Sequence, residues 1–207
     1  MIPPKIIHQV WVGDKRRPIK WMQTWQEKHP GWLYVLWDND RILNFPWRNW
    51  KHIRTYWNAR QWHGVTDMVR YEILYNFGGF TAPADSECLL PIDELLDMGP
   101  EFDCFSCLEE AGSYDRIVPV LCATPGNELV GRLITGLHEQ ESLGPVPWIA
   151  TGNGYMAKTY KSMDYKRLKF YPFHYFVPEH HQGAKYTGSD KIYCRQYWGT
   201  TNNLYEV

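Results

Sequence analysis

The chain has 207 residues, with 22 lysines and arginines, 23 aspartates and glutamates, and a formal net charge of −1 at pH 7. This length fits one domain with a sizeable core, and the near-zero charge argues against a nucleic-acid binder that neutralises many phosphates. Eleven tryptophans raise the aromatic content to 16%, so we expect a surface that stacks on sugars or bases.

The termini and the cysteines give no sign of export. No run of 18 apolar residues is present, and residues 1–8 lack the basic and apolar regions of a signal peptide. The cysteines number five, which does not indicate a disulfide framework. Cys104 and Cys107 have CxxC spacing but no second pair, so we interpret them as small buried residues rather than a zinc or redox site. We expect a cytoplasmic protein without a transmembrane segment.

The first elements alternate between strand and helix. Residues 5–12 are rich in Ile and Val, which predicts a buried strand. Trp21 and Trp25 share one helical face, and residues 33–37 form a second apolar run. This order predicts a parallel βαβ unit. Residues 44–62 carry four tryptophans among polar residues and are predicted to be irregular or short-helical.

A helix over residues 67–77 is the clearest element. Thr66 is its expected N-cap, and the glycine pair 78–79 its expected end. Four apolar residues recur every four positions along it: Val65, Val69, Ile73 and Phe77.

The rest of the chain alternates short strands with helical segments. The expected elements are strands at 80–82, 102–107, 118–123 and 168–171, a helical turn at 91–96 and a helix at 128–137. From residue 183 onward no periodicity is clear. No repeat or linker divides the chain, so we expect a single α/β domain covering residues 1–207.

Three features point to chemistry, each with an ordinary alternative. Asp67 and Arg70 share a helix face, although a surface ion pair would look the same. Asp85 and Glu87 follow a short strand, at the position where open α/β sheets bind ligands, and their oxygens suit Mg²⁺ or Mn²⁺ on a diphosphate. The alternative is a solvated acidic turn. Trp11 ends the first strand and either stacks on a base or belongs to the core.

In this order, these pieces resemble the small DXD-type nucleotide-sugar glycosyltransferases, a sugar-binding-region family that includes capsular polysaccharide and outer-chain mannosyl- and galactosyltransferases. The resemblance implies a GT-A fold: one Rossmann-like α/β domain whose central, mostly parallel mixed sheet is flanked by helices. The matching stretches lie within 2–13, 25–38, 66–79 and 85–93, with weaker similarity at 123–126, 151–154 and 170–172.

The resemblance also implies a donor site assembled from distant parts of the chain. Trp11 would stack on the base, and Asp67 and Arg70 would hold sugar hydroxyls and the diphosphate. Asp85 would bind the metal, Mn²⁺ or Mg²⁺, and act with Arg70 in catalysis by stabilising the leaving nucleoside diphosphate. The implied donor-binding residues are Val10, Trp11, Asp67, Arg70, Ala84, Asp85, Asn153, Trp198 and Thr200.

Two departures from the family pattern affect this site. Pro83 stands where the family has the first Asp of its motif, so Asp85 would hold the metal more weakly, with Glu87 as a possible helper. The family often has a His-rich ending that reaches metal and phosphate. Residues 195–201 contain no His here, and Arg195 could supply positive charge instead.

The leading hypothesis is a glycosyltransferase that moves a sugar from a nucleotide-sugar, expected to be a UDP-sugar, to a glycan or other hydroxyl acceptor. Close relatives imply retention at the anomeric carbon. An inverting enzyme would instead need a base for the acceptor hydroxyl, and Glu109, Glu110 and Asp115 are candidates by residue type only.

Two alternatives remain open. One is a glycosyltransferase-like domain that binds a sugar-nucleotide or glycan with weak or no turnover, because Pro83 replaces the first motif Asp. The other is a tryptophan-rich carbohydrate-binding module. Such modules are usually β-sandwiches, and the long helix over residues 67–77 argues against that reading.

Overall fold

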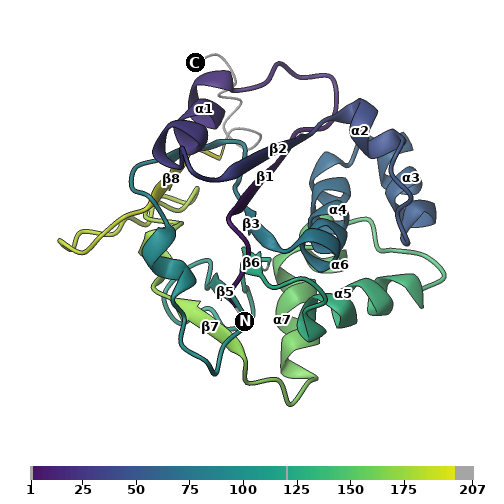
Figure 1. Ribbon diagram of the computed structural model, residues 1–207. Helices are drawn as coiled ribbons and strands as arrows, with labels where there is room; N and C mark the ends of the chain where they lie inside the picture. Colours follow the sequence, from purple (N-terminus) through teal and green to yellow (C-terminus); the bar gives the residue numbers. More distant parts are fainter. Residues whose placement is uncertain (1, 120, 199–207) are drawn as a thin grey trace.

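A six-stranded mixed sheet with strand order β2-β1-β3-β6-β5-β7 organises the chain (Figure 1). The computed structural model describes residues 2–119 and 121–198. The strands of the sheet are β1 (Ile6–Val10), β2 (Leu33–Trp37), β3 (Gly79–Thr81), β5 (Cys104–Cys107), β6 (Cys122–Ala123) and β7 (Leu168–Tyr171). A separate antiparallel pair joins β4 (Ser86–Cys88) to β8 (Cys194–Gln196).

Most neighbouring strands of the large sheet run parallel. β1 pairs in parallel with β2 and β3, and β5 with β7, whereas β6 runs antiparallel to β3 and β5. The expected α/β fold with a mostly parallel mixed sheet is therefore confirmed. Because β6 reverses direction between β3 and β5, the carboxyl ends of β1, β2, β3 and β5 all lie at one edge.

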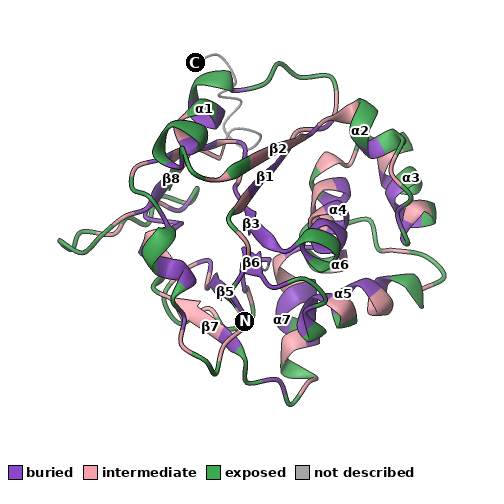
Figure 2. Ribbon diagram, viewed as in Figure 1, coloured by how far each residue is buried: buried purple, intermediate pink, exposed green. Residues whose placement is uncertain are grey.

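Helices cover both faces of the sheet. They are α1 (Ile19–Lys28), α2 (Asn39–Leu43), α3 (Trp50–Asn58), α4 (Trp62–Phe77), α5 (Glu128–His138), α6 (Pro147–Ala150) and α7 (Asn153–Lys161), with 3₁₀ turns η1 (Asp93–Leu96) and η2 (Phe173–Tyr175). Val10 of β1 packs into a core shared with α3, α4, α5 and α7, whereas Ile7 packs with α1, η1 and β8. The central strands are buried from both sides (Figure 2).

Several expectations about the fold are confirmed. β1, α1 and β2 form the predicted βαβ unit, in which Ile6 pairs with Leu33 and Val10 with Trp37. The five cysteines are free and buried, including the CxxC pair. No helix in the described part of the chain is long and apolar enough to cross a membrane.

Other boundaries were wrong. α4 begins at Trp62, so Thr66 lies inside the helix and is not its cap. Within residues 44–62, of the two expected readings, irregular or short-helical, the helical one holds for residues 50–58, and the tryptophans of this region pack into or against the core: Trp47, Trp50, Trp57 and Trp62. The strand expected at 118–123 is confined to β6, and the local sequence pattern predicts neither α7 nor β8. Tertiary packing, which local periodicity does not report, decides these segments.

His8 couples the stability of this fold to pH. It is 2% exposed, its Nδ1 accepts a hydrogen bond from Trp37 Nε1 at 3.2 Å, and its Nε2 bonds the Gly78 carbonyl at 3.0 Å. Burial lowers the pKa of His8 to about 4. Because the unfolded chain binds this proton below pH ~6.5, the His8 contribution to the unfolding free energy should fall by about 2 kcal/mol between pH 7 and pH 5.

Urea unfolding of the wild type and of His8→Gln at both pH values measures this contribution. The loss of stability on acidification should be smaller in the variant by that amount. The expectation fails if both proteins lose the same free energy.

Candidate functional site at the carboxyl edge of the sheet

Polar side chains gather where the parallel strands end. Trp11 follows β1, Asp38 follows β2, Asp85 lies in the loop after β3, and Glu109 lies two residues beyond β5. The carboxyl edge of an open α/β sheet is where ligands bind, because strand ends and following loops diverge there. This edge is therefore the candidate functional site.

A cavity of about 350 Å³ opens beside the ends of β1 and β2. Its lining contains several basic residues as well as an aromatic ring: Trp11, Gly13, Lys15, Arg16, Arg17, Asp38, Asn39 and Asp40. Arg17 pairs with Asp38 at 3.2 Å. A planar aromatic wall beside positive charge suits a ligand with a flat ring and an anionic group.

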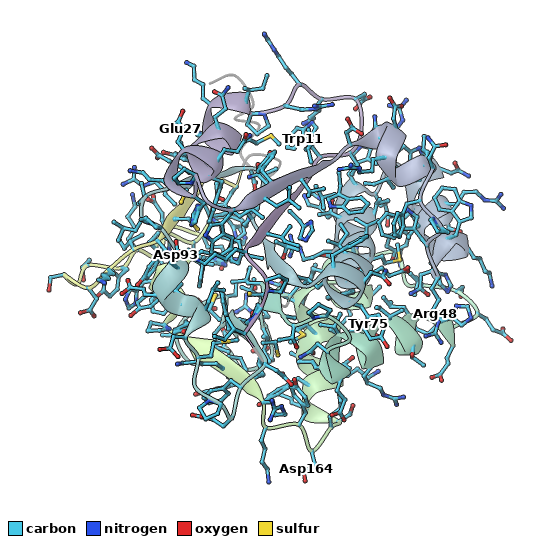
Figure 3. The ribbon with its side chains drawn as sticks, in the orientation of Figure 1. Trp11, Glu27, Arg48, Tyr75, Asp93 and Asp164 are labelled. Atoms are coloured by element: carbon cyan, nitrogen blue, oxygen red, sulfur yellow. The ribbon has the colours of Figure 1, made fainter. Side chains whose placement is uncertain are left out.

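Trp11 is held against the end of β2. Its backbone N–H donates to the Trp37 carbonyl at 3.0 Å, and its indole N–H donates to the Lys15 carbonyl at 2.9 Å. The ring is partly exposed, and Figure 3 shows Trp11 beyond β1, between α1 and α2. Its position is thus closer to the expected ligand contact than to a fully buried core tryptophan. Val10, which precedes it, is 8% exposed and pairs with Trp37.

The turn below Trp11 requires glycine. Gly13 has φ +101°, and a Cβ there would lie 2.9 Å from the Trp62 ring. The Asn39 side chain accepts a hydrogen bond from the Gly13 N–H (3.0 Å) and donates one to the Gly13 carbonyl (2.9 Å). The two hydrogen bonds with Asn39 and the contact with the Trp62 ring therefore hold this turn, which lines the cavity, in place.

Asp85 is oriented by the C-terminal strand. Its Oδ1 accepts a hydrogen bond from Gln196 Nε2 at 2.7 Å, and its backbone carbonyl accepts from the Tyr197 N–H at 3.0 Å. The Tyr197 hydroxyl donates to Glu87 at 2.7 Å, and its ring stacks on Trp21 with centroids 4.2 Å apart. β8 and α1 therefore hold the acidic loop from both sides.

Pro83 changes what this loop can offer a cation. It supplies only a carbonyl, which already accepts from Ser86 Oγ at 2.7 Å, and the neighbouring Ala84 is buried. At residues 83–85, where the resemblance places the two-Asp motif, Asp85 is thus the carboxylate that this loop offers. The nearby Glu87 accepts a hydrogen bond from the Tyr197 hydroxyl. Such a donor set fits a Mg²⁺-like ion that keeps several waters and binds one carboxylate together with substrate phosphates.

Asp67 and Arg70 are not an ordinary surface pair. Burial raises the pKa of the Asp67 carboxyl, although Arg70 and a hydrogen bond from Thr151 Oγ1 at 3.1 Å act in the opposite direction. A Cβ at Gly152 would lie 2.8 Å from Asp67 Oδ2, so the loop after α6 closes directly over this carboxylate. The Nε atom of Arg70 is buried and has no hydrogen-bond partner among the described residues. A buried donor of this kind indicates a missing acceptor, such as a bound anion or hydroxyl.

Glu109 occupies a more enclosed position than its neighbours. Its side chain is 10% exposed, and its two oxygens bond Asn153 Nδ2 and His180 Nε2, each at 3.1 Å. Of the three acids considered by type, Glu110 pairs instead with Arg116 at 2.5 Å, and Asp115 is exposed. His180 carried no signal in the sequence, because it lies in a polar stretch without periodicity.

A chain of contacts links four of the predicted site residues: Asp67, Asn153, Trp198 and Asp85. It runs from Asp67 to Thr151, continues from Asn153 at the start of α7 to Glu109 and His180, and then passes through Trp198 and Tyr197 to Asp85. The Trp198 indole N–H also donates to the Glu179 carbonyl at 2.8 Å. Val10 and Trp11 lie at the β1–β2 part of the same edge. Arg195 is exposed on β8, and Thr200 lies outside the described residues.

Comparison with known proteins connects this geometry to a family. Residues 15–100 match the family described as "Glycosyltransferase sugar-binding region containing DXD motif", a stretch that includes Asp67, Arg70 and Asp85. "Inositol phosphoceramide mannosyltransferase 2" of Schizosaccharomyces pombe is 33% identical over 97 residues, covering 45% of this chain and 28% of that protein. "Mannosyl phosphorylinositol ceramide synthase" of Saccharomyces cerevisiae is 31% identical over 101 residues, covering 45% of this chain and 25% of that protein.

A solved structure shares the fold. "PaToxG Glycosyltransferase" has a TM-score of 0.58 at 12% identity, covering 78% of this chain and 70% of that chain. The alignments with the two yeast proteins cover about a quarter of their length. The resemblance to DXD-type glycosyltransferases is confirmed for residues 15–100, and the solved structure shows the shared fold.

Proposed function

We propose that this chain, which carries a DXD-type glycosyltransferase sugar-binding region, transfers a sugar from a nucleotide-sugar donor to a hydroxyl of a glycan or similar acceptor. The observation that supports this most directly is the position of Asp67, Arg70 and Asp85, all within the matched residues 15–100, at the carboxyl edge of the sheet. The Schizosaccharomyces pombe relative is named a mannosyltransferase and the Saccharomyces cerevisiae relative a mannosyl phosphorylinositol ceramide synthase, so a hexose is the expected sugar. A UDP-linked donor remains our expectation.

The cavity beside Trp11 is the proposed nucleotide pocket. The indole would stack on the base, and Lys15, Arg16 and Arg17 would surround the diphosphate with positive charge. Asp85 would hold Mn²⁺ or Mg²⁺, which neutralises charge on the leaving diphosphate when bound. The loss of the first motif Asp predicts a weak metal site that fills mainly when the donor brings its own phosphate oxygens.

Arg70 and Asp67 would act where the sugar meets the diphosphate. The unpartnered Nε of Arg70 is a fixed donor in a buried position, which suits the charge that builds on the leaving oxygen. Asp67, held by Thr151, would accept from sugar hydroxyls. We propose transfer with retention, a course that needs no dedicated base and leaves Glu109 without a role in the chemical step.

The second candidate function is donor or glycan binding with little turnover. Pro83 is the observation in its favour, since it removes a carboxylate from the motif. A panel of UDP- and GDP-sugars with and without Mn²⁺ separates the two functions. Metal-stimulated release of nucleoside diphosphate supports transfer, whereas donor-dependent thermal stabilisation without donor consumption supports binding alone.

Trp11 gives a direct test of the nucleotide pocket. Trp11→Ala should weaken nucleoside diphosphate affinity by about 1–3 kcal/mol, the range found for aromatic–base stacking. Calorimetric titration of the nucleotide measures this, with Trp148→Ala as the control because Trp148 is also exposed but lies on α6, outside the cavity. Equal dissociation constants for wild type and Trp11→Ala would exclude the stacking role.

A further inference from the structure

Glu109, His180 and His181 form a cluster that the proposed transfer reaction does not use. One potential ligand atom from each residue lies within 4.8 Å of the others. The side chains of Glu109 and His180 are 10% and 3% exposed, and His181 is exposed. Two enclosed ligands and one at the surface leave a route for a small ion to enter from solvent.

We propose that this cluster is a binding site for a divalent transition-metal ion of the Zn²⁺ class, separate from the Asp85 position. Two imidazoles and one carboxylate are a donor set that Zn²⁺ and its chemical neighbours favour over Mg²⁺. The four ligands of a tetrahedral ion with bonds of about 2.0–2.1 Å lie roughly 3.3 Å apart. Glu109 Oε1 and His180 Nε2 already lie 3.1 Å apart, so their separation is close to that of two ligands of one ion, and the imidazole needs only to turn so that Nε2 faces the ion.

The surroundings also hold the carboxylate in place. Asn153 Nδ2 donates to Glu109 Oε2 at 3.1 Å, which leaves Oε1 directed at His180. Outer hydrogen bonds of this kind orient the ligands of protein metal sites. His181 packs beside the His180 ring, with centroids 4.1 Å apart, and a small rotation of its exposed ring would complete the set.

One hydrogen bond has to break when an ion binds His180, and its loss opposes binding. The Gln182 N–H donates to His180 Nδ1 at 3.3 Å, so the proton of the neutral ring lies on Nε2, facing Glu109. Coordination through Nε2 moves this proton to Nδ1 and breaks the bond from Gln182. That bond is long, and losing it costs less than a metal–imidazole bond supplies.

The site is distinct from the proposed donor-metal position. Asp85 is held by Gln196 and Tyr197, whereas Glu109 and its partners come from the segment after β5, from α7 and from residues 180–181. The Trp198 ring centre lies 5.4 Å from that of His180 and 4.9 Å from that of His181, and the preceding residue, Tyr197, bonds the Asp85 carbonyl through its N–H.

Cobalt titration of the purified full-length chain, without donor, tests the proposal. The wild type should bind one Co²⁺ with the visible absorption of a tetrahedral ion, and Zn²⁺ should displace it. His181→Ala should weaken Co²⁺ binding by more than about a hundredfold, because losing even an outer partner costs about 10- to 100-fold. His181 is exposed, so this change removes its ring contacts with His180 and Trp198 but no buried core side chain.

Three further variants make the result specific. His181→Cys should restore binding and add a thiolate-to-cobalt charge-transfer band, which the five buried cysteines of the wild type do not produce. His138→Ala, another exposed histidine, and Asp85→Asn should bind Co²⁺ like the wild type. The proposal is overturned if the wild type binds no Co²⁺, if His181→Ala binds it unchanged, or if Asp85→Asn abolishes binding. Because no donor is present, failure here leaves the transfer proposal standing.

Discussion

Replacement of Asp85 by alanine is expected to abolish Mn²⁺-stimulated donor consumption, with a fall in kcat of at least about 10²- to 10³-fold. The reason is that Pro83 leaves Asp85 as the carboxylate at the motif position, so no second motif Asp can keep the ion in place. Release of nucleoside diphosphate, measured across a Mn²⁺ titration, is the direct readout.

Asp85→Asn distinguishes the loss of the negative charge from the loss of the hydrogen bond that holds the loop. Its side-chain oxygen can still accept the bond from Gln196, which anchors the loop to β8, but it carries no charge. Both variants should therefore lose metal stimulation, whereas only alanine should lower the melting temperature. Glu27→Gln is the control, because Glu27 is an exposed carboxylate on α1 with no part in the proposed metal site. Unchanged Mn²⁺ stimulation in Asp85→Asn would refute the ligand role.

Pro83→Asp is the complementary gain of function. A second carboxylate in the motif should raise Mn²⁺ affinity, because these ions depend on the number and charge of oxygen ligands. If Mn²⁺ affinity does not rise, Pro83 is not at the position of the missing motif Asp.

Replacement of Arg70 by glutamine is the second large effect that we expect. The buried Nε without a partner is available to an acceptor that the substrate would supply, so its loss should reduce kcat by about 10²- to 10³-fold with little change in base binding. Arg70→Lys should recover only part of this loss, since lysine restores the charge but not the planar donor geometry.

The adjacent carboxylate makes a stability control necessary. Arg70 offsets the raised pKa of buried Asp67, so its removal should raise that pKa further and lower the melting temperature. Arg54→Gln, on the exposed face of α3, is the control for loss of a single arginine. A kcat for Arg70→Gln within twofold of the wild type, in folded protein, would contradict the proposed role.

Local pattern predicted the elements whose packing follows their own sequence. Alternation of apolar runs with one helical face predicted β1, α1 and β2, and the glycines after Phe77 marked the end of α4. The bounds of α3 could not be predicted within residues 44–62, which were expected to be irregular or short-helical, because the tryptophans there follow no obvious period, although Ile53 and Tyr56 pack in the core. The extra first turn of α4 depends on Trp62 fitting against Gly13, a contact across the fold.

The candidate site also contains residues that could be predicted from the sequence and residues that could not. Asp67, Arg70 and Asp85 could be named because they lie in one contiguous stretch with a family pattern. Gln196 and His180 could not, since each gains its meaning from a partner far away in the chain: Asp85 lies 111 residues from Gln196, and Glu109 lies 71 residues from His180. No local periodicity carries information over such separations.

The bond between Asp85 and Gln196 has a consequence for how the protein is made. A ribosome adds residues in order, so the acidic loop is synthesised long before β8 exists to hold it. The loop that this contact closes is among the longest in the chain, and closure carries an entropic cost that earlier contacts in the sheet reduce. A nascent chain interrupted before residue 194 therefore leaves Asp85 without its anchor, and the acidic loop is held in place only after β8 has been made.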